Sequence, residues 1–347
     1  MQDERIKLRL YRALTILLVI GISVASVIGV EFVARWLLPA WAPTRPERVT
    51  LWQYDSLLGW AQNPGTSVTF AGRDYSVNVE INSQGLRDQE YAIARTSKKR
   101  MLILGDSFGW GFGVEVNERF SEVIEERHPD WEIINASVSG YGTDQQFLYL
   151  RERGVTYKPD AVVLVMSGTD FHNNTVGEEY WYYKPVFQVS DGRLEVQNVP
   201  VPASTLLQRI RRFVFANTYL GHGILGVEWK LMSFLRGRAP SGSILAGNEP
   251  AESEEDAVTY HLVKAIAQTC ALQSIQFFVV TGKMSAQHET EIKDLAHQDG
   301  IPALILGTSI DSVGSSLRFP HDEHWNRDGH KFVADRIEIF LQGYGLF

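Results

Sequence analysis

Two short segments far apart in the chain carry the residue types of a nucleophilic catalytic site. Ser107 lies in the sequence 105–109 (Gly-Asp-Ser-Phe-Gly), which matches the G-x-S-x-G pattern of a serine raised on a strand-to-helix turn. Near the C-terminus, Asp322 and His324 stand two residues apart, so an extended backbone points both side chains the same way. The carboxylate would then orient the imidazole, which takes the serine proton during attack on an acyl carbonyl. The alternative is a surface turn that contains a serine.

Two further segments stand where neighbouring strands should end. Residues 135–142 (Asn-Ala-Ser-Val-Ser-Gly-Tyr-Gly) include Gly140, and glycines there let backbone N–H groups approach a ligand closely. Residues 167–170 (Ser-Gly-Thr-Asp) follow a wholly apolar run. Parallel α/β proteins place their sites at the carboxyl edge of the sheet, which is where these segments would lie.

The elements that position these segments alternate along the chain. Short apolar runs typical of buried strands are separated by segments with helical periodicity. The expected strands are 99–104, 131–134, 161–166, 276–281 and 302–306, and the expected helices are 117–127, 143–153, 256–272, 287–299 and 327–342. Continuous apolar strands that alternate with helices indicate a parallel sheet covered on both faces. We therefore predict a three-layer α/β/α domain over residues 99–347.

In the order of its four segments the chain resembles the GDSL/SGNH hydrolase superfamily. Gly105 to Ser107 match its first block, Gly140 supplies the glycine of the second, and residues 322–326 (Asp-Glu-His-Trp-Asn) match the last. The resemblance implies an SGNH-like, flavodoxin-like fold, a Ser107–His324–Asp322 triad, and an oxyanion hole formed by Ser107, Gly140 and Thr169. The last block and the upstream residues 54–60 and 85–88 (Tyr-Asp-Ser-Leu-Leu-Gly-Trp and Gly-Leu-Arg-Asp) are similar to bacterial membrane-anchored members, including those related to polysaccharide O-acetylation.

Two positions depart from the pattern of that superfamily. Many members have Asp-x-x-His, which would require an acid at position 321, but the residue there is His321 and Asp322 is the available acid. Thr169 stands where the oxyanion-hole asparagine is expected. A threonine hydroxyl can donate one hydrogen bond, but its reach is shorter, and loss of one oxyanion donor removes roughly 3 kcal/mol of transition-state stabilisation. Asn173 or Asn174 would substitute if the loop is shifted.

The N-terminus is the apolar exception in an otherwise ordinary composition. Residues 13–30 form an uncharged run of eighteen residues, and apolar character continues to Leu38, so we predict a transmembrane anchor at 13–38. Basic residues are denser before the run than after it, which places residues 1–12 in the cytoplasm and the remaining chain outside. A cleaved signal peptide ending at Ala25 and a buried globular helix are the alternatives.

Three segments lie outside the regular alternation of strands and helices: two between the anchor and the predicted sheet, and one insertion within the sheet domain. Residues 39–50 begin with a proline-rich stretch typical of a stiff tether. Alternating residues within 51–98 predict a small β-rich module packed on the main domain. At about 176–255 an insertion interrupts the alternation. It begins with aromatic residues, becomes basic and amphipathic over 206–238, and ends in a small-residue linker. We expect a cap, a surface near the membrane, or two ordinary packed helices.

Composition and motif spacing exclude several classes of function. A formal net charge of −8 argues against a nucleic-acid partner, and the single cysteine, Cys270, rules out an intrachain disulfide and a C-x-x-C zinc site. His321, His324 and His330 match no metal-binding helix motif, and Asp106 with Asp170 as a glycosidase acid pair is less simple than a supporting role. The sequence implies no metal and no cofactor.

The sequence thus favours a membrane-anchored serine esterase or O-acyltransferase of the cell envelope. Its expected substrates are small acyl esters, above all O-acetyl groups of an extracytoplasmic glycan, and water or a sugar hydroxyl would accept the acyl group. The departure at Thr169 leaves a second hypothesis open, a weakly active or inactive binding module that partners a membrane-bound O-acyltransferase.

Overall fold

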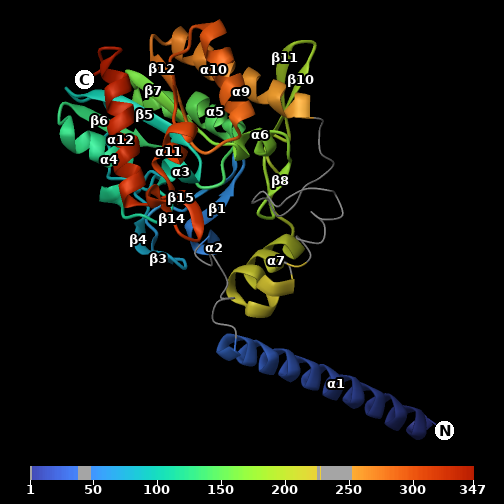
Figure 1. Cartoon of the computed structure of the whole chain (residues 1–347). Helices are drawn as coiled ribbons and strands as arrows, with labels where there is room; N and C mark the ends of the chain where they lie inside the picture. The colour runs from blue at the N-terminus through green and yellow to red at the C-terminus, as the bar shows by residue number, and fades with distance from the viewer. Residues whose placement is uncertain (1, 38–47, 225–226, 228–251) are drawn as a thin grey trace. The chain divides into compact units, whose positions relative to one another are not determined.

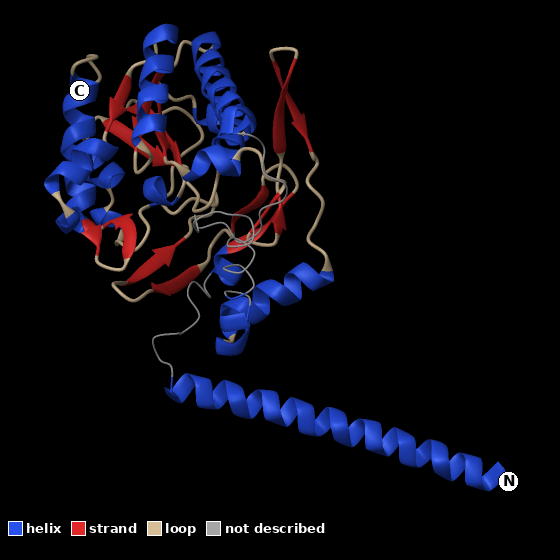
Figure 2. Cartoon of the chain, turned by 45° about the vertical axis from the view of Figure 1, so that its right-hand side comes forward, coloured by secondary structure: helices blue, strands red, loops and turns tan. Residues whose placement is uncertain are grey.

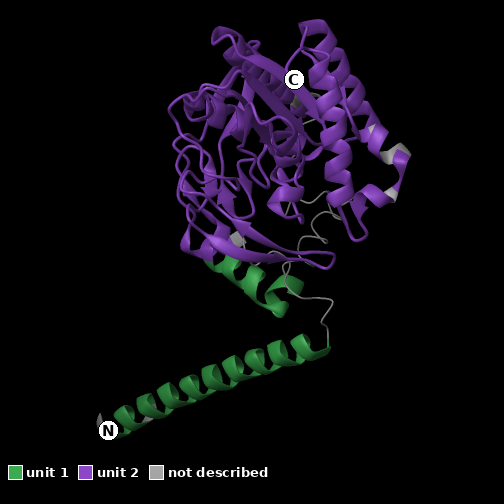
Figure 3. Cartoon of the chain, turned by 90° about the vertical axis from the view of Figure 1, so that its left-hand side faces the viewer, with its two compact units in different colours: residues 1–46, 210–239 green, residues 47–209, 240–347 purple. Residues whose placement is uncertain are grey.

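A computed structural model describes residues 2–37, 48–224, 227 and 252–347. The chain divides into two compact units (Figure 3). One unit comprises residues 1–46 and 210–239, and the other comprises residues 47–209 and 240–347.

The larger unit is built on a parallel sheet of five strands with the spatial order β13–β12–β7–β5–β6 (Figures 1 and 2). The strands are β5 (Lys99–Gly105), β6 (Trp131–Asn135), β7 (Ala161–Met166), β12 (Gln276–Thr281) and β13 (Ala303–Ile305). In chain order this is the flavodoxin-like arrangement 2-1-3-4-5, so the strand order reverses between β5 and β7. Ligands of such sheets bind at the carboxyl ends of the strands beside that reversal. The prediction of a parallel α/β sheet is confirmed.

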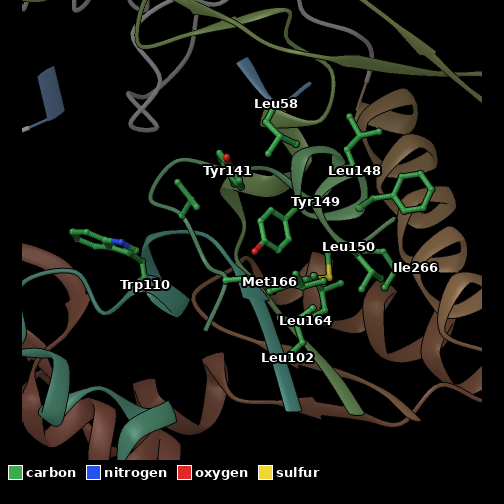
Figure 4. Packing of buried hydrophobic residues seen from close by; sticks show 14 of the residues in the cluster. Leu58, Leu102, Trp110, Tyr141, Leu148, Tyr149, Leu150, Leu164, Met166 and Ile266 are labelled. Atoms are coloured by element: carbon green, nitrogen blue, oxygen red, sulfur yellow. The ribbon is translucent and has the colours of Figure 1, made fainter. Parts of the chain in front are cut away.

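Helices cover both faces of this sheet because its strands are apolar on both sides. On β7, Val162, Leu164 and Met166 join one core cluster, and Ala161, Val163 and Val165 join the other. The first cluster includes side chains of α5 (Thr143–Glu152) and α9 (Glu252–Leu272), and part of it is seen in Figure 4. The second includes side chains of α4 (Phe120–Arg127) and α12 (Arg327–Gln342). The predicted three layers are therefore present.

The remaining elements of the sheet domain are short, apart from α10. They are α3 (Ser107–Trp110), η2 (Val116–Glu118), η3 (Gly154–Tyr157), α6 (Thr169–Asn173), α10 (Ala286–Asp299), α11 (Gly307–Val313), η4 (Ser315–Leu317), β14 (Arg318–Phe319) and β15 (Asp322–Trp325).

The helix predicted at 117–127 is wrong at its N-terminal end, where η2 and α4 are separated by Arg119. Arg119 is extended (φ −72°, ψ 144°), and its fully buried guanidinium pairs with Glu122 and approaches Asp88 at 3.7 Å. A buried arginine needs these acceptors, and reaching them takes this residue out of the helix.

The predicted β-rich module forms two hairpins. They follow a short helix, α2 (Arg48–Leu51), and their strands are β1 (Trp52–Asp55), β2 (Gly59–Gln62), β3 (Ser67–Ala71) and β4 (Ser76–Glu80). Buried Trp60 and Val79 belong to the same core cluster as α5 and α9, so the hairpins share the core of the sheet domain. Most of the predicted tether, residues 39–47, lies outside the described residues; its last three residues belong to α2.

The first part of the insertion holds two hairpins that were not predicted from the sequence. Their strands are β8 (Glu178–Glu179), β9 (Tyr182–Tyr183), β10 (Val186–Ser190) and β11 (Arg193–Gln197). The connections are unlike each other: Asp191-Gly192 is a common hairpin turn, whereas Tyr180 and Trp181 adopt φ values of +50° and +57°, which bulky residues seldom do. Helix α7 (Leu206–Asn217) follows, and residues 225–226 and 228–251, with most of the predicted linker, lie outside the described residues.

The smaller unit contains α1 (Gln2–Leu37), a single long helix over most of the predicted anchor. Residues 4–37 are long and apolar enough to cross a membrane, with a mean hydropathy of 2.6 in the most apolar stretch and no burial of that stretch within the structure. A signal sequence near an N-terminus can meet the same criterion of length and composition. Among the described residues, α1 is the one helix with this property.

Candidate active site

Ser107 begins α3 directly after β5, at the carboxyl edge of the sheet beside the reversal of strand order. Asp106 caps the helix, because its carboxylate accepts a hydrogen bond of 2.8 Å from the N–H of Phe108. The glycines of the G-x-S-x-G sequence allow close approach of the next loop: a Cβ at Gly109 would lie 2.4 Å from Ser137 Oγ, and one at Gly105 would lie 3.1 Å from it. The segment therefore holds Ser107, which is partly exposed, against residues 135–142.

The hairpin of β14 and β15 brings the predicted histidine and aspartate to this serine. His324 Nε2 lies 2.7 Å from Ser107 Oγ, and His324 Nδ1 is hydrogen-bonded to Asp322 Oδ1. The same carboxylate oxygen accepts the N–H of His324 at 3.1 Å, which holds the two-residue step in place. The three side chains predicted from the sequence thus form one connected chain of hydrogen bonds, with 14% of the His324 side chain and 20% of the Asp322 side chain exposed.

Aromatic side chains fix the plane of the His324 ring. Phe112 stacks on it with a centroid separation of 4.2 Å, and Phe108 lies tilted at 4.9 Å. Phe108 in turn packs against the buried Trp325. Phe112 was missed at the level of sequence, although its position between Gly111 and Gly113, shortly after the serine, marks an aromatic residue on a loop near the site.

Gly140 lies in a loop that is tied to the serine segment by its backbone. Val138 N–H donates to Gly105 O at 3.1 Å, and the side chain of Asn135 donates to Gly109 O at 2.9 Å. Gly140 has a φ of +86°, and a Cβ there would lie 2.6 Å from Cε2 of Tyr180. Tyr180 of the β8–β9 turn therefore covers the glycine, a contact that sequence reasoning did not predict.

Thr169 begins α6 after β7, and its hydroxyl is engaged on the protein side. Thr169 Oγ1 lies 2.8 Å from Ser167 Oγ, and Ser167 Oγ donates to Asp106 Oδ2 at 2.6 Å. Thr169 Oγ1 also reaches Asp106 Oδ2 at 3.5 Å. When Asp106 is ionised, Ser167 must give its only proton to the carboxylate, so Thr169 must donate to Ser167 or to Asp106. The single threonine proton is then unavailable to an oxyanion.

The geometry gives little support to Asn174 as an oxyanion donor or to Asp106 and Asp170 as a glycosidase acid pair. Asn174 accepts the N–H of Asp144 at 3.0 Å and donates to Thr259 at 2.8 Å, so its amide is engaged in the core. Asp170 is fully buried and accepts the N–H of Ser167 at 2.6 Å. Burial, followed by the charge of Asp106, raises the pKa of Asp170 well above its usual range, and burial likewise raises the pKa of Asp106.

The two other C-terminal histidines lie in separate environments. His321 pairs with Asp74 at 2.7 Å, and this hydrogen bond lowers the pKa of the Asp74 carboxyl. His330 is buried, and its Nδ1 accepts the N–H of Phe120 at 3.4 Å. Burial lowers the pKa of His330 to about 3, so its ring is neutral. His321 and His330 therefore have separate partners, and the contacts of His330 are those expected of a packing residue.

Comparisons with known proteins show the family to which the chain is similar. The sequence model of the GDSL-like lipase/acylhydrolase family matches residues 101–337. A search of curated proteins found no match.

Similar solved structures include TesA, at 12% identity with 71% of this chain and 99% of that chain covered and a TM-score of 0.42. An esterase, EstA from Pseudoalteromonas sp., has the same identity and TM-score, with 71% and 98% covered. An acetyl xylan esterase has 13% identity and a TM-score of 0.40, with 69% and 97% covered.

Proposed function

Because the chain belongs to the GDSL-like lipase/acylhydrolase family and is an ester hydrolase of the SGNH superfamily, we propose that Ser107 is its nucleophile, His324 its general base and Asp322 the orienting acid. The observation that carries this proposal is the hydrogen-bonded chain from Ser107 Oγ through both ring nitrogens of His324 to Asp322. A serine hydroxyl is a weak nucleophile, and this arrangement supplies the base that activates it.

The reaction follows from these positions. His324 Nε2 takes the Ser107 proton as Oγ attacks the acyl carbonyl, and Asp322 stabilises the resulting imidazolium. The carbonyl oxygen becomes an oxyanion, for which the backbone N–H groups of Ser107 and Gly140 are the donors we assign. His324 then protonates the departing alcohol, which leaves an acyl-serine. Water attacks this ester with His324 again as base and releases the acid, or a sugar hydroxyl attacks and receives the acyl group.

Thr169 completes the oxyanion hole in one protonation state of its neighbours. A neutral Asp106 donates to Ser167, Ser167 then donates to Thr169, and the threonine proton is free to face the oxyanion. An ionised Asp106 reverses the chain and withdraws that proton. Burial raises the pKa of Asp106, so this reversal occurs at a higher pH than it would beside an exposed aspartate.

The substrate class we propose is a small acyl ester, with O-acetyl groups of an extracytoplasmic glycan as the leading case. Aromatic side chains lie close to the proposed site, with Tyr180 against Gly140 and Phe112 against His324. This crowding suits a short acyl group better than a long chain. The similarity of residues 322–326 to members related to polysaccharide O-acetylation supports a glycan. The apolar α1, with its basic residues on the N-terminal side, supports a membrane anchor and a catalytic domain outside the cytoplasm.

The test of the catalytic proposal is covalent labelling with a serine-directed phosphonate. The full chain should be labelled on the peptide that contains Ser107, and Ser107→Ala should abolish labelling. The rates of hydrolysis of acetyl, butyryl and octanoyl esters of one chromogenic alcohol then measure the acyl preference, and we expect the acetyl ester to be hydrolysed fastest. Labelling on another serine would refute the assignment.

One observation favours the second hypothesis, a binding module that partners a membrane-bound O-acyltransferase. With Asp106 ionised, Thr169 offers no proton to an oxyanion, so catalysis would rest on two backbone donors. Complete absence of phosphonate labelling, together with retained binding of an acetylated oligosaccharide by the folded protein, would favour this module over an enzyme.

A further inference from the structure

The first amphipathic helix of the insertion has an apolar stripe on its exposed side. Leu206, Leu207, Ile210 and Phe213 of α7 are between 50% and 71% exposed. At 100° per residue, Leu206, Ile210 and Phe213 fall within about 60° of one another and Leu207 lies at the edge of the same face. An apolar stripe left in water is unfavourable, which calls for something that covers it.

The opposite side of α7 is already occupied. Gln208 is buried, and its amide donates to Glu178 at 2.8 Å while its carbonyl accepts the N–H of Thr205 at 2.8 Å. Gln208 is about 160° from Leu206 around the helix axis. The side chain that packs against protein and the apolar stripe therefore face opposite ways, so the stripe is not a core face that has been left open.

The charges around the stripe identify the kind of surface that fits it. Arg209 and Arg211 lie on either flank of the apolar residues, roughly 60° and 140° from Leu206, and the sequence of α7 contains no acidic residue. A helix with an apolar face between arginines is typical of one that lies in a bilayer interface, with the aliphatic and aromatic side chains among the acyl chains and the guanidinium groups at the phosphates.

Contacts within the smaller unit tie the segment after α7 to the predicted anchor. The Glu31 carboxylate of α1 accepts the N–H of Tyr219 at 2.9 Å and the N–H of Leu220 at 3.0 Å. Arg35 pairs with Glu31 at 2.9 Å and donates to Asn217 O at 3.1 Å, at the end of α7. A carboxylate this close to an apolar span is costly unless it is paired, and these partners satisfy it.

The same contacts account for the pattern of exposure along α1. Among the residues of α1 whose exposure is described, Glu31 and Ala34 are of intermediate exposure and the others are exposed. The remaining apolar surface of the helix is free for lipid, whereas its C-terminal end receives residues 217–220. The C-terminal end of α7 and the residues up to Leu220 therefore lie where an N-terminal membrane span would leave the bilayer.

From these observations we infer that α7 is an interfacial helix that binds the surface of an anionic phospholipid bilayer, with its connection to the anchor made through Glu31 and Arg35. The inference rests on the proposed membrane anchoring by α1. It adds a second point of membrane contact, and it assigns α7, rather than the whole insertion, to the lipid surface.

The test uses the full chain in vesicles of phosphatidylcholine mixed with phosphatidylglycerol. An environment-sensitive fluorophore is attached to Phe213→Cys, and quenching is compared between lipids that carry a nitroxide near the headgroup and lipids that carry it deep in the acyl chain. Cys270 is buried and should not react, which the unmodified chain checks. We expect strong quenching by the shallow nitroxide at position 213 and none at Glu195→Cys, an exposed position on β11.

A third reporter separates this inference from the proposed anchoring. A fluorophore at Ile20→Cys should be quenched by the deep nitroxide if α1 spans the bilayer. Quenching at position 20 without quenching at position 213 would overturn the interfacial helix and leave the anchor intact. Loss of both, with release of the protein from vesicles by alkaline carbonate, would show that the anchoring itself is wrong.

Two sets of variants test the stripe and the tie. Leu207→Gln/Ile210→Gln, with the reporter retained at position 213, should abolish shallow quenching and leave turnover of a soluble ester unchanged. Arg209→Gln/Arg211→Gln should remove the extra quenching seen with phosphatidylglycerol over pure phosphatidylcholine.

Glu31→Ala should speed amide hydrogen exchange at Tyr219 and Leu220, whereas Glu4→Ala should not. Unchanged quenching in both double variants would overturn the inference, because another part of the chain would then hold position 213 at the bilayer.

Discussion

The two sides of Ser107 are built in different ways. On the base side, side chains from β15 make one directed chain of hydrogen bonds, in which His324 Nδ1 donates to Asp322 and Nε2 is left to accept the Ser107 proton. On the oxyanion side, Thr169, Ser167 and Asp106 make a second chain whose direction depends on whether the carboxylate is charged. In the mechanism we propose, the first chain activates the nucleophile whenever His324 is neutral, and the second supplies a donor only in one protonation state.

This difference shows which parts of an esterase can be altered independently. A nucleophile and its base must be matched to each other, so neither can be replaced alone. Oxyanion donors act separately on one oxygen atom, and backbone N–H groups remain when a side chain is changed. Thr169 stands where the resemblance predicts an asparagine. In the mechanism we propose, this change lies on the oxyanion side of Ser107, where one donor can be altered without loss of the others.

The largest expected effect comes from removing the nucleophile or the base. Ser107→Ala and His324→Ala should each lower kcat for a chromogenic ester by about 10⁶-fold, because either change ends covalent catalysis. The double variant should be no worse than either single variant, since the two residues act as a unit. A loss of less than tenfold in His324→Ala would show that another group takes the Ser107 proton.

A smaller but still severe loss is expected when only the orientation of the base is disturbed. Asp322→Asn should lower kcat by about 10⁴-fold, because an amide at that position favours the wrong imidazole tautomer. The matched control is His321→Ala, which removes the neighbouring histidine and its pair with Asp74 but touches neither Ser107 nor His324. Equal losses in the two variants would place the orienting group elsewhere.

The pairing of Asp322 with His324 could be predicted from the sequence because its geometry is local. Two residues in an extended strand point the same way, so the spacing of Asp322 and His324 was sufficient to pair them, and the apolar strands were sufficient to predict the sheet. The hairpin of β10 and β11 was also within reach of prediction, because Asp191-Gly192 between two alternating segments is a strong turn signal.

The oxyanion side could not be read in the same way because its contacts are tertiary. Tyr180 and Trp181 hold positive φ values that their residue types disfavour, and the packing of Tyr180 against Gly140 and Trp52 outweighs that preference. The hydrogen bonds among Asp106, Ser167 and Thr169 join the ends of two strands 61 residues apart in the chain, as the Ser167–Asp106 pair shows. No spacing rule connects such groups.

An intermediate effect is expected from crowding Gly140. Gly140→Ala places a Cβ 2.6 Å from Tyr180 in a backbone with φ +86°, and the conformation alone costs about 1–2 kcal/mol. The displaced N–H should lower kcat/KM by about tenfold or more, because full loss of one oxyanion donor lowers kcat by roughly 10²–10³-fold. Tyr180→Ala in the same chain should recover part of the activity by removing the clash.

The control for that experiment is Gly65→Ala. Gly65 has a φ of +69°, and no atom lies within 4 Å of the position that an alanine Cβ would take, so this variant carries the same backbone strain away from the serine. Chemical denaturation should show a lower free energy of unfolding for both alanine variants, and steady-state kinetics should show a loss for Gly140→Ala alone. Equal kinetic losses would mean that the effect reports stability rather than the oxyanion donor.

The smallest expected effect concerns Thr169 and depends on pH. Thr169→Val removes the hydroxyl at similar volume. A hydrogen bond to a charged acceptor contributes about 1.5–3 kcal/mol, and because the Thr169 hydroxyl is shared with Ser167 we expect the lower end of this range, or roughly tenfold in kcat. Below the raised pKa of Asp106 the carboxyl is neutral and the threonine proton is free, so the ratio of wild-type to variant kcat should be largest at acidic pH. As the pH rises through that pKa, Asp106 ionises, the chain reverses, and the ratio should fall toward one. Thr169→Ser should follow the wild type, while Ser167→Ala should make the ratio independent of pH because it cuts the link to Asp106. A ratio that does not change with pH while Ser167 is present would contradict this prediction. It would show that the charge of Asp106 does not control whether Thr169 donates to the oxyanion.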